Sequence, residues 1–224
     1  MAAINLVDVN VKYQLKNSTV HALKGIDLSL HDGDHIGVIG RNGSGKSTLL
    51  KVLSKVMPQS SGRVDIDGER LSLLGRHSGL IPRASLEENA KVKAYSLGLN
   101  YKQAVKFADE SINAANLQSK RDAPLESLST GMAGRFNISI NTRLVREIVI
   151  MDEWVSTLDM AGSSEGGMLE KVSSKAKIFV FASHNESLIR QLCNKVILLD
   201  VGELLYFGGD VDLAFSRLAQ LSSK

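Results

Sequence analysis

The sequence has little cysteine and no long apolar run. Cys193 is the single cysteine among 224 residues, so no disulfide forms within the chain, and a lone thiol suits a reducing compartment. Its apolar neighbours predict a small core residue rather than a nucleophile. No stretch reaches the roughly 20 apolar residues that cross a bilayer, and the first residues lack the apolar segment of a signal peptide. We therefore expect neither a disulfide-stapled secreted domain nor an integral membrane protein, and any role at a membrane should be peripheral.

The sequence also lacks a strong charge bias. Its formal net charge is +3, and no run of lysines and arginines stands out. We therefore expect no nucleic-acid partner. The hydrophobic content of 43% and charged content of 23% are ordinary for a globular protein. A chain of this length is sufficient for one large α/β domain with a substantial core.

The most specific motif is Gly-Arg-Asn-Gly-Ser-Gly-Lys-Ser at residues 40–47, which follows the apolar run 36–39 and precedes a helical pattern. It fits the phosphate-binding pattern G-x-x-x-x-G-K-[ST] between a strand and a helix. Its glycines allow successive amide N–H groups to point into one concavity, and the helix adds its positive end. Lys46 supplies a charge for the β- and γ-phosphates, and the Ser47 hydroxyl is a ligand for Mg²⁺. The sequence therefore predicts a nucleoside triphosphate site whose contacts come from Gly40, Arg41, Asn42, Gly43, Ser44, Gly45, Lys46, Ser47 and Thr48.

Two further apolar runs end in groups that suit phosphate chemistry. Asp152 and Glu153 follow the run 148–151, which reads as a strand buried on both faces. Ligands bind at the carboxyl edge of open parallel sheets, so we assign Asp152 to Mg²⁺ and Glu153 to the attacking water. His184 follows the run 178–182 and is expected at the γ-phosphate. An acidic pair or a histidine at a strand end is often only structural; the phosphate motif upstream favours the functional interpretation.

Hydrophobic periodicity divides the chain into β-rich and helical parts. Strand patterns are expected at 3–13, 20–30, 36–39, 64–66, 71–74, 148–151, 178–181, 196–199 and 204–207. Helices are expected near 49–56, 86–97, 101–115, 132–144, 162–174 and 185–193, and from about 210 onward. Asp32-Gly33 is predicted to form a hairpin turn between the second and third strands. Residues 85–145 show no strand pattern, which indicates a helical insertion in an α/β domain.

Leu-Ser-Thr-Gly-Met at residues 128–132 resembles, in variant form, the signature sequence of the ATP-binding subunits of ABC transporters. With the phosphate motif and Asp152-Glu153, the resemblance covers essentially the whole chain. It implies a P-loop α/β fold: a mostly parallel core sheet with an N-terminal antiparallel β subdomain (about 1–84 and 146–210), a helical subdomain (about 85–145) and a short C-terminal helix (about 211–224). It also implies that a signature segment closes over ATP bound to the other subunit of a homodimer, with Ser129 and the backbone of Gly131 as phosphate contacts. The segment consists of Leu128, Ser129, Thr130, Gly131 and Met132.

Three other positions fit the same family. Tyr13 resembles the aromatic residue that stacks on adenine, although an ordinary strand tyrosine is the simpler alternative. The loop 156–159 resembles the segment that crosses the dimer interface and carries Asp159. His184 matches the switch histidine of the family.

The family's usual glutamine ahead of the helical subdomain is missing, since no glutamine occurs between Gln59 and Gln103. Residues 73–82, the Thr-Gly-Met ending of the signature and Trp154-Val155 instead resemble exporters of lipid-linked O-antigen, teichoic acid or capsule chains. His77 or Gly75 takes roughly the glutamine's place. Some exporters of this type carry a further carbohydrate-binding domain, which we do not expect in this chain.

The resemblance implies an ATPase that uses ATP and Mg²⁺, works as a homodimer and docks on integral membrane permease subunits. It would lie at the cytoplasmic face of the membrane and drive export of a polysaccharide or its lipid-linked precursor. Two alternatives stay open at this stage. The same motor could serve another cargo, such as a drug, lipid or amino acid, or the chain could be a soluble ABC ATPase that acts on DNA or ribosomes.

Overall fold

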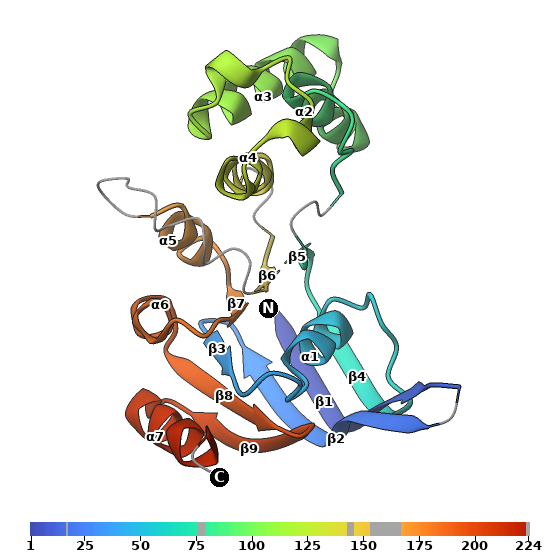
Figure 1. Cartoon of the computed structure of the whole chain (residues 1–224), viewed down its shortest axis with the longest axis vertical. Helices are drawn as coiled ribbons and strands as arrows, with labels where there is room; N and C mark the ends of the chain where they lie inside the picture. Colours follow the sequence, from blue (N-terminus) through green and yellow to red (C-terminus); the bar gives the residue numbers. More distant parts are fainter. Residues whose placement is uncertain (17, 76–78, 143–145, 153–166, 223–224) are drawn as a thin grey trace.

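The computed structural model describes residues 1–16, 18–75, 79–142, 146–152 and 167–222 (Figure 1). The strands are β1 (Ala3–Gln14), β2 (Thr19–His31), β3 (His35–Ile39), β4 (Ser61–Asp67), β5 (Arg70–Leu73), β6 (Ile148–Met151), β7 (Ile178–Ala182), β8 (Lys195–Asp200) and β9 (Glu203–Gly208). The α-helices are α1 (Lys46–Leu53), α2 (Leu86–Ser96), α3 (Tyr101–Ala114), α4 (Thr130–Thr142), α5 (Met168–Ser173), α6 (Glu186–Leu192) and α7 (Val211–Ser222). Short 3₁₀ turns occupy Gln118–Lys120 and Leu125–Ser127.

Within these ranges the strands form two sheets. The smaller sheet is antiparallel, in the order β2-β1-β4, and the larger has the order β5-β6-β7-β3-β8-β9. All pairs in the larger sheet are parallel except β8 with β9. Strands β6 and β7 are buried at every position, as expected of apolar runs covered on both faces. The predicted combination of a mostly parallel core sheet and an antiparallel N-terminal sheet is confirmed.

The predicted hairpin at Asp32-Gly33 is wrong. β2 belongs to the antiparallel sheet, whereas β3 pairs in parallel with β7 and β8 in the other sheet. Asp67-Gly68 behaves in the same way, because β4 pairs with β1 and β5 pairs with β6. A tight turn signal fixes a local change of direction, but which strand each neighbour pairs with depends on long-range packing.

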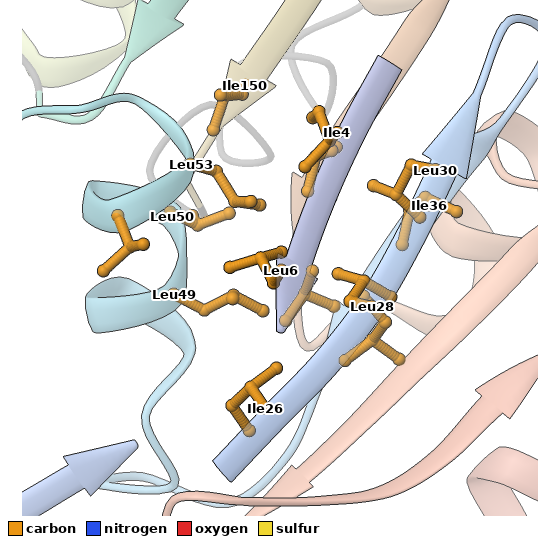
Figure 2. Packing of buried hydrophobic residues seen from close by; sticks show 14 of the residues in the cluster. Ile4, Leu6, Ile26, Leu28, Leu30, Ile36, Leu49, Leu50, Leu53 and Ile150 are labelled. Carbon is orange, nitrogen blue, oxygen red and sulfur yellow. The ribbon is translucent and has the colours of Figure 1, made fainter. Parts of the chain in front are cut away.

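Helix α1 packs between the two sheets. Figure 2 shows Leu49 and Leu53 of α1 close to Ile4 and Leu6 of β1, with Ile150 of β6 beside them. These side chains are at most 2% exposed. Each fully buried leucine or isoleucine contributes about 1.5–3 kcal/mol. This shared core holds the start of α1 in a fixed place relative to both sheets.

The outer face of the larger sheet is covered by α5, α6 and α7, which form a second apolar cluster with it. Helices α2, α3 and α4 build a third cluster of their own, in the upper part of Figure 1. A capping box begins each of the first two helices of this group, as their sequence pattern of Ser or Asn followed three residues later by Glu or Gln indicates: Ser85 with Glu88 begins α2, and Asn100 with Gln103 begins α3. Helix α4 begins at Thr130, two residues before the predicted start, because the Ser129 hydroxyl accepts the Met132 N–H at 3.3 Å. Among the described helices, none combines the length and the apolar character that a bilayer crossing requires.

Cys193 is a core residue, as predicted, and only 8% of the residue is exposed. Burial raises the pKa of the Cys193 thiol to about 12. The reactive species is the thiolate, so we expect no reaction with an aromatic disulfide reagent at pH 8 in the folded protein and one equivalent after denaturation in urea. Absorbance of the released thiol measures both. Rapid labelling of the folded protein would contradict this account of the core.

Candidate functional site

The phosphate motif forms the loop between the end of β3 and the start of α1. Gly40, Gly43 and Gly45 have backbone φ angles of +152°, +79° and +108°, in the region that residues other than glycine rarely adopt. A Cβ on Gly40 would lie 2.2 Å from the Leu199 carbonyl oxygen, and one on Gly45 would lie 2.7 Å from the Ala22 carbonyl oxygen. Gly40 and Gly45 are therefore required by both conformation and space, whereas Gly43 has open space around it.

A cavity of about 340 Å³ opens beside this loop. Its lining comes from the start of β2, from the phosphate loop and the first turn of α1, from the residue after β6 and from the β8–β9 turn. The residues are Val20, His21, Ala22, Asn42, Gly43, Ser44, Gly45, Lys46, Ser47, Thr48, Asp152 and Val201. The structure thus brings together the phosphate loop and Asp152, which lie more than a hundred residues apart in the sequence.

Lys46 is held in the loop by backbone carbonyl groups. Its side chain is largely buried, and Nζ donates to the Gly40 carbonyl oxygen at 2.7 Å and to the Arg41 carbonyl oxygen at 3.0 Å. The Arg41 carbonyl also accepts the Ser44 N–H at 3.1 Å. The ammonium group is thereby fixed beside a cavity lined by backbone amides at a helix N-terminus, an arrangement that favours anions.

Ser47 and Asp152 bring a hydroxyl and a carboxylate to the same cavity. Asp152 directly follows β6, and its N–H donates to the Leu73 carbonyl oxygen at 3.2 Å, which continues the pairing of β5 with β6. Mg²⁺ prefers hard oxygen ligands and keeps several waters or phosphate oxygens. The chemistry of these two side chains fits Mg²⁺.

The remaining predicted residues are more dispersed. Tyr13 is half-buried, and its hydroxyl lies 3.2 Å from Thr48 Oγ1 and donates to Met57 Sδ at 3.2 Å. It borders the first turn of α1, and its stacking on adenine stays a prediction. His184 follows β7, is exposed and does not belong to the cavity lining described above. Glu153 and Asp159 lie outside the described residues.

The predicted signature residues 128–132 lie at the start of α4. Ser129 and Thr130 are exposed, while Leu128 and Met132 pack against the third cluster. In Figure 1, α4 lies in the upper part of the molecule, apart from α1 and its loop. The structure does not bring this segment and the phosphate loop of the same chain together.

The turn between β8 and β9 is the part of the site that the sequence did not indicate. Asp200 accepts Arg41 Nε at 2.9 Å and Nη2 at 2.8 Å, while Arg41 Nη1 donates to the Leu221 carbonyl oxygen at 3.0 Å. The hydrogen bond to Asp200 raises the pKa of the Arg41 guanidinium above its usual value. The sequence around Val201-Gly202 indicates a turn, and β8 and β9 pair antiparallel on either side of it, but the pattern gives no sign that the turn supports the loop.

Comparison with known proteins gives a family and a set of relatives. A family model described as "ABC transporter" matches residues 23–156. A "Teichoic acids export ATP-binding protein TagH" from Staphylococcus saprophyticus is 32% identical over 206 residues, which cover 91% of this chain and 76% of that protein. An "O-antigen export system ATP-binding protein RfbE" from Yersinia enterocolitica is 35% identical over 190 residues, covering 84% and 79%.

The overlap with some relatives is shorter, and the structural matches are more distant in sequence. A TagH from Enterococcus faecalis is 34% identical over 88% of this chain, and the match spans only 44% of that protein. Among solved structures, the dimeric ATP-binding cassette MJ0796 bound to ADP and Pi has a TM-score of 0.77 at 21% identity, covering 92% of this chain and 98% of that chain. This structural likeness concerns the fold.

Gly40 and Gly43 provide a matched test of the loop geometry. We expect Gly40→Ala to lower the free energy of unfolding by about 2–5 kcal/mol, because strain and overpacking combine where the Cβ would meet the Leu199 carbonyl. Gly43→Ala meets no neighbouring atom, so its cost is only that of the left-handed backbone, about 1 kcal/mol. Urea denaturation without nucleotide measures both. Equal losses for the two variants would contradict the close approach at Gly40.

Proposed function

Because the chain belongs to the ABC transporter family, we propose that it is the ATP-hydrolysing subunit of a transporter that exports a polysaccharide or its lipid-linked precursor. The observation that carries the ATPase proposal is the single cavity shared by Lys46, Ser47 and Asp152. The cargo rests on two relatives whose names describe export of teichoic acids and O-antigen. The missing glutamine and the variant signature of the sequence support the same subfamily.

The chain's own residues divide the work of phosphoryl transfer. Backbone amides of the loop and Lys46 bind and orient the β- and γ-phosphates. Ser47 and Asp152 would hold Mg²⁺, which supplies neutralising charge when it is bound. Glu153, directly after Asp152, accepts a proton from the attacking water, and His184 contacts the γ-phosphate. Tyr13 stacks on the adenine ring.

The site is completed by a second copy of the chain. The separation of the start of α4 from the phosphate loop within one chain, together with the exposure of Ser129 and Thr130, supports a contact in trans. In a homodimer, residues 128–132 of each subunit close on the ATP of the other, and Asp159 lies at the shared interface. Closure of the dimer moves the helical subdomain (about 85–145) and the permease subunits docked on it, at the cytoplasmic face of the membrane.

Glu153→Gln tests the hydrolysis step. We expect this variant to bind ATP with unchanged affinity and to lose at least about a hundredfold in kcat, because the amide no longer accepts a proton from water. Stable ATP-dependent dimers should accumulate and be visible by light scattering after size-exclusion chromatography. Glu69→Gln, at a carboxylate whose side chain is 70% exposed, is the control and should behave as wild type. Normal turnover by Glu153→Gln would overturn the assignment.

The cargo and the partner require the protein in its membrane setting. We expect the chain, isolated from detergent-solubilised membranes, to carry an integral membrane permease, and deletion of its gene to leave lipid-linked polysaccharide inside the cell. Mass spectrometry of the isolate and surface labelling of the sugar measure the two outcomes. Isolation with ribosomes or DNA would contradict a transport role, and normal surface polysaccharide would contradict this class of cargo.

A further inference from the structure

Arg41 stands in the phosphate loop, but its side chain bonds to groups outside the loop. Two guanidinium nitrogens donate to the two oxygens of the Asp200 carboxylate as a bidentate pair, and the third nitrogen donates to the Leu221 carbonyl oxygen. The Asp200 side chain is only 12% exposed. A planar fork on a carboxylate fixes direction as well as distance, which a lysine at this position would not do.

The residues next to Asp200 contact the loop at two further points. The Leu199 carbonyl lies against Gly40, and the Gly202 N–H donates to the Ser44 carbonyl oxygen at 3.0 Å. Val201 lines the cavity and has a φ of +46°, a strained conformation for a β-branched residue. Such strain persists only where the surroundings determine the backbone strongly, and it clusters at functional sites.

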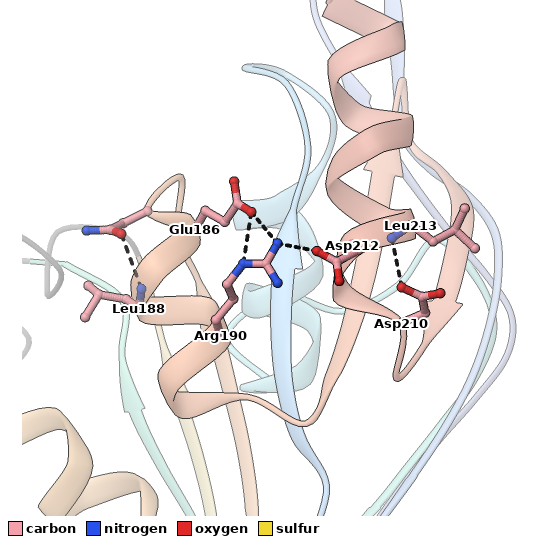
Figure 3. A network of polar contacts seen from close by, with 7 residues as sticks. Glu186, Leu188, Arg190, Asp210, Asp212 and Leu213 are labelled. Carbon is pink, nitrogen blue, oxygen red and sulfur yellow. Dashed lines mark hydrogen bonds and ion pairs between the residues drawn. The ribbon is translucent and has the colours of Figure 1, made fainter.

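Helix α7 joins this support through its last turn. Carbonyl groups in the last turn of a helix have no partner within the helix, and Arg41 supplies one for Leu221. A cation at this end also matches the helix dipole. The other end of α7 is tied separately: Figure 3 shows Arg190 of α6 between Glu186 and Asp212, with Arg190 Nη2 to Asp212 Oδ1 at 2.7 Å.

We propose that Arg41 is a positioning residue whose side chain ties the phosphate loop to the β8–β9 turn and to the end of α7, and so sets the affinity for ATP. The route is short, because the Arg41 carbonyl accepts both Lys46 Nζ and the Ser44 N–H. Displacing the Arg41 backbone therefore displaces the groups that hold Lys46 and shape the loop. The inference rests on the proposed ATPase function.

The sign of the effect at Asp200 separates positioning from simple electrostatics. Asp200→Asn removes a negative charge near the site of a polyanion, so the loss of Coulomb repulsion alone predicts tighter ATP binding. Loss of the contact between Arg41 and Asp200, if that contact positions the loop, predicts weaker ATP binding. We expect Asp200→Asn to raise the Kd and KM for ATP by about three- to tenfold, the size typical of losing one intramolecular hydrogen bond at a side chain that water still reaches, with kcat unchanged. A loss of folded protein would instead lower the apparent kcat and leave KM alone.

Arg41→Met and three further variants complete the set. Arg41→Met combined with Asp200→Asn should be no worse than the poorer single variant, because both remove the same contact. Ser222→Pro displaces the Leu221 carbonyl without changing charge, since proline disfavours helical angles in the residue before it, and should also raise KM. Arg190→Met removes the same charge as Arg41→Met but loosens the far end of α7, and should leave KM at the wild-type value.

Hydrogen exchange of the nucleotide-free full-length protein gives a readout that does not depend on ATP. We expect faster exchange of the Ser44 amide in Asp200→Asn and Ser222→Pro, and no change in Arg190→Met. If Asp200→Asn bound ATP as tightly as wild type or more tightly, and the Ser44 amide exchanged at the wild-type rate, the positioning role of Arg41 would be overturned. A wild-type protein that does not bind ATP would overturn the proposed function, and the exchange of Ser44 would still decide the role of Arg41.

Discussion

The structure depends on a close approach of backbone to backbone beneath the phosphate loop. Gly40 and Gly45 lie so near the carbonyl groups of Leu199 and Ala22 that neither position has room for a Cβ. These contacts press the loop against β8 on one side and β2 on the other, and β2 and β8 belong to different sheets. The cavity is the space left along this line of contact. Its shape therefore follows from how the two sheets meet, and the loop sequence alone does not determine it.

Helix α1 converts that contact into a fixed site. Its apolar side packs between the sheets through Leu49, Leu50 and Leu53, so its N-terminus cannot shift without disturbing the shared core. Lys46 begins the helix, and its ammonium is tied back to carbonyls of the preceding loop. Burial of leucines and placement of a charge are thus two consequences of one helix, which explains how a short loop can hold a defined shape.

The sequence was informative where chemistry is local and uninformative where it depends on packing. The phosphate motif, the capping boxes at Ser85 and Asn100 and the buried strand before Asp152 follow from spacing and residue type. The partners of the strands on either side of Asp32-Gly33 do not, because a turn residue carries no information about pairing. Asp200 is the sharper case: an acidic residue beside a hairpin turn is ordinary in sequence, and only the fold brings it to Arg41.

Arg41 connects the phosphate loop with the packing behind it. Its backbone carbonyl accepts hydrogen bonds within the loop, while its side chain bonds to Asp200 and to the end of α7. Each of its hydrogen bonds is modest alone, since the side chain is 40% exposed and water competes for it. The geometry matters more than the energy of the pair: one planar group fixes its own carbonyl relative to the β8–β9 turn and the last turn of α7. A loop that must offer several amides and one ammonium to the same polyanion gains affinity when those groups are already in place before binding. Arg41, Asp200 and Leu221 contribute to binding in this sense, although none of the three lines the cavity.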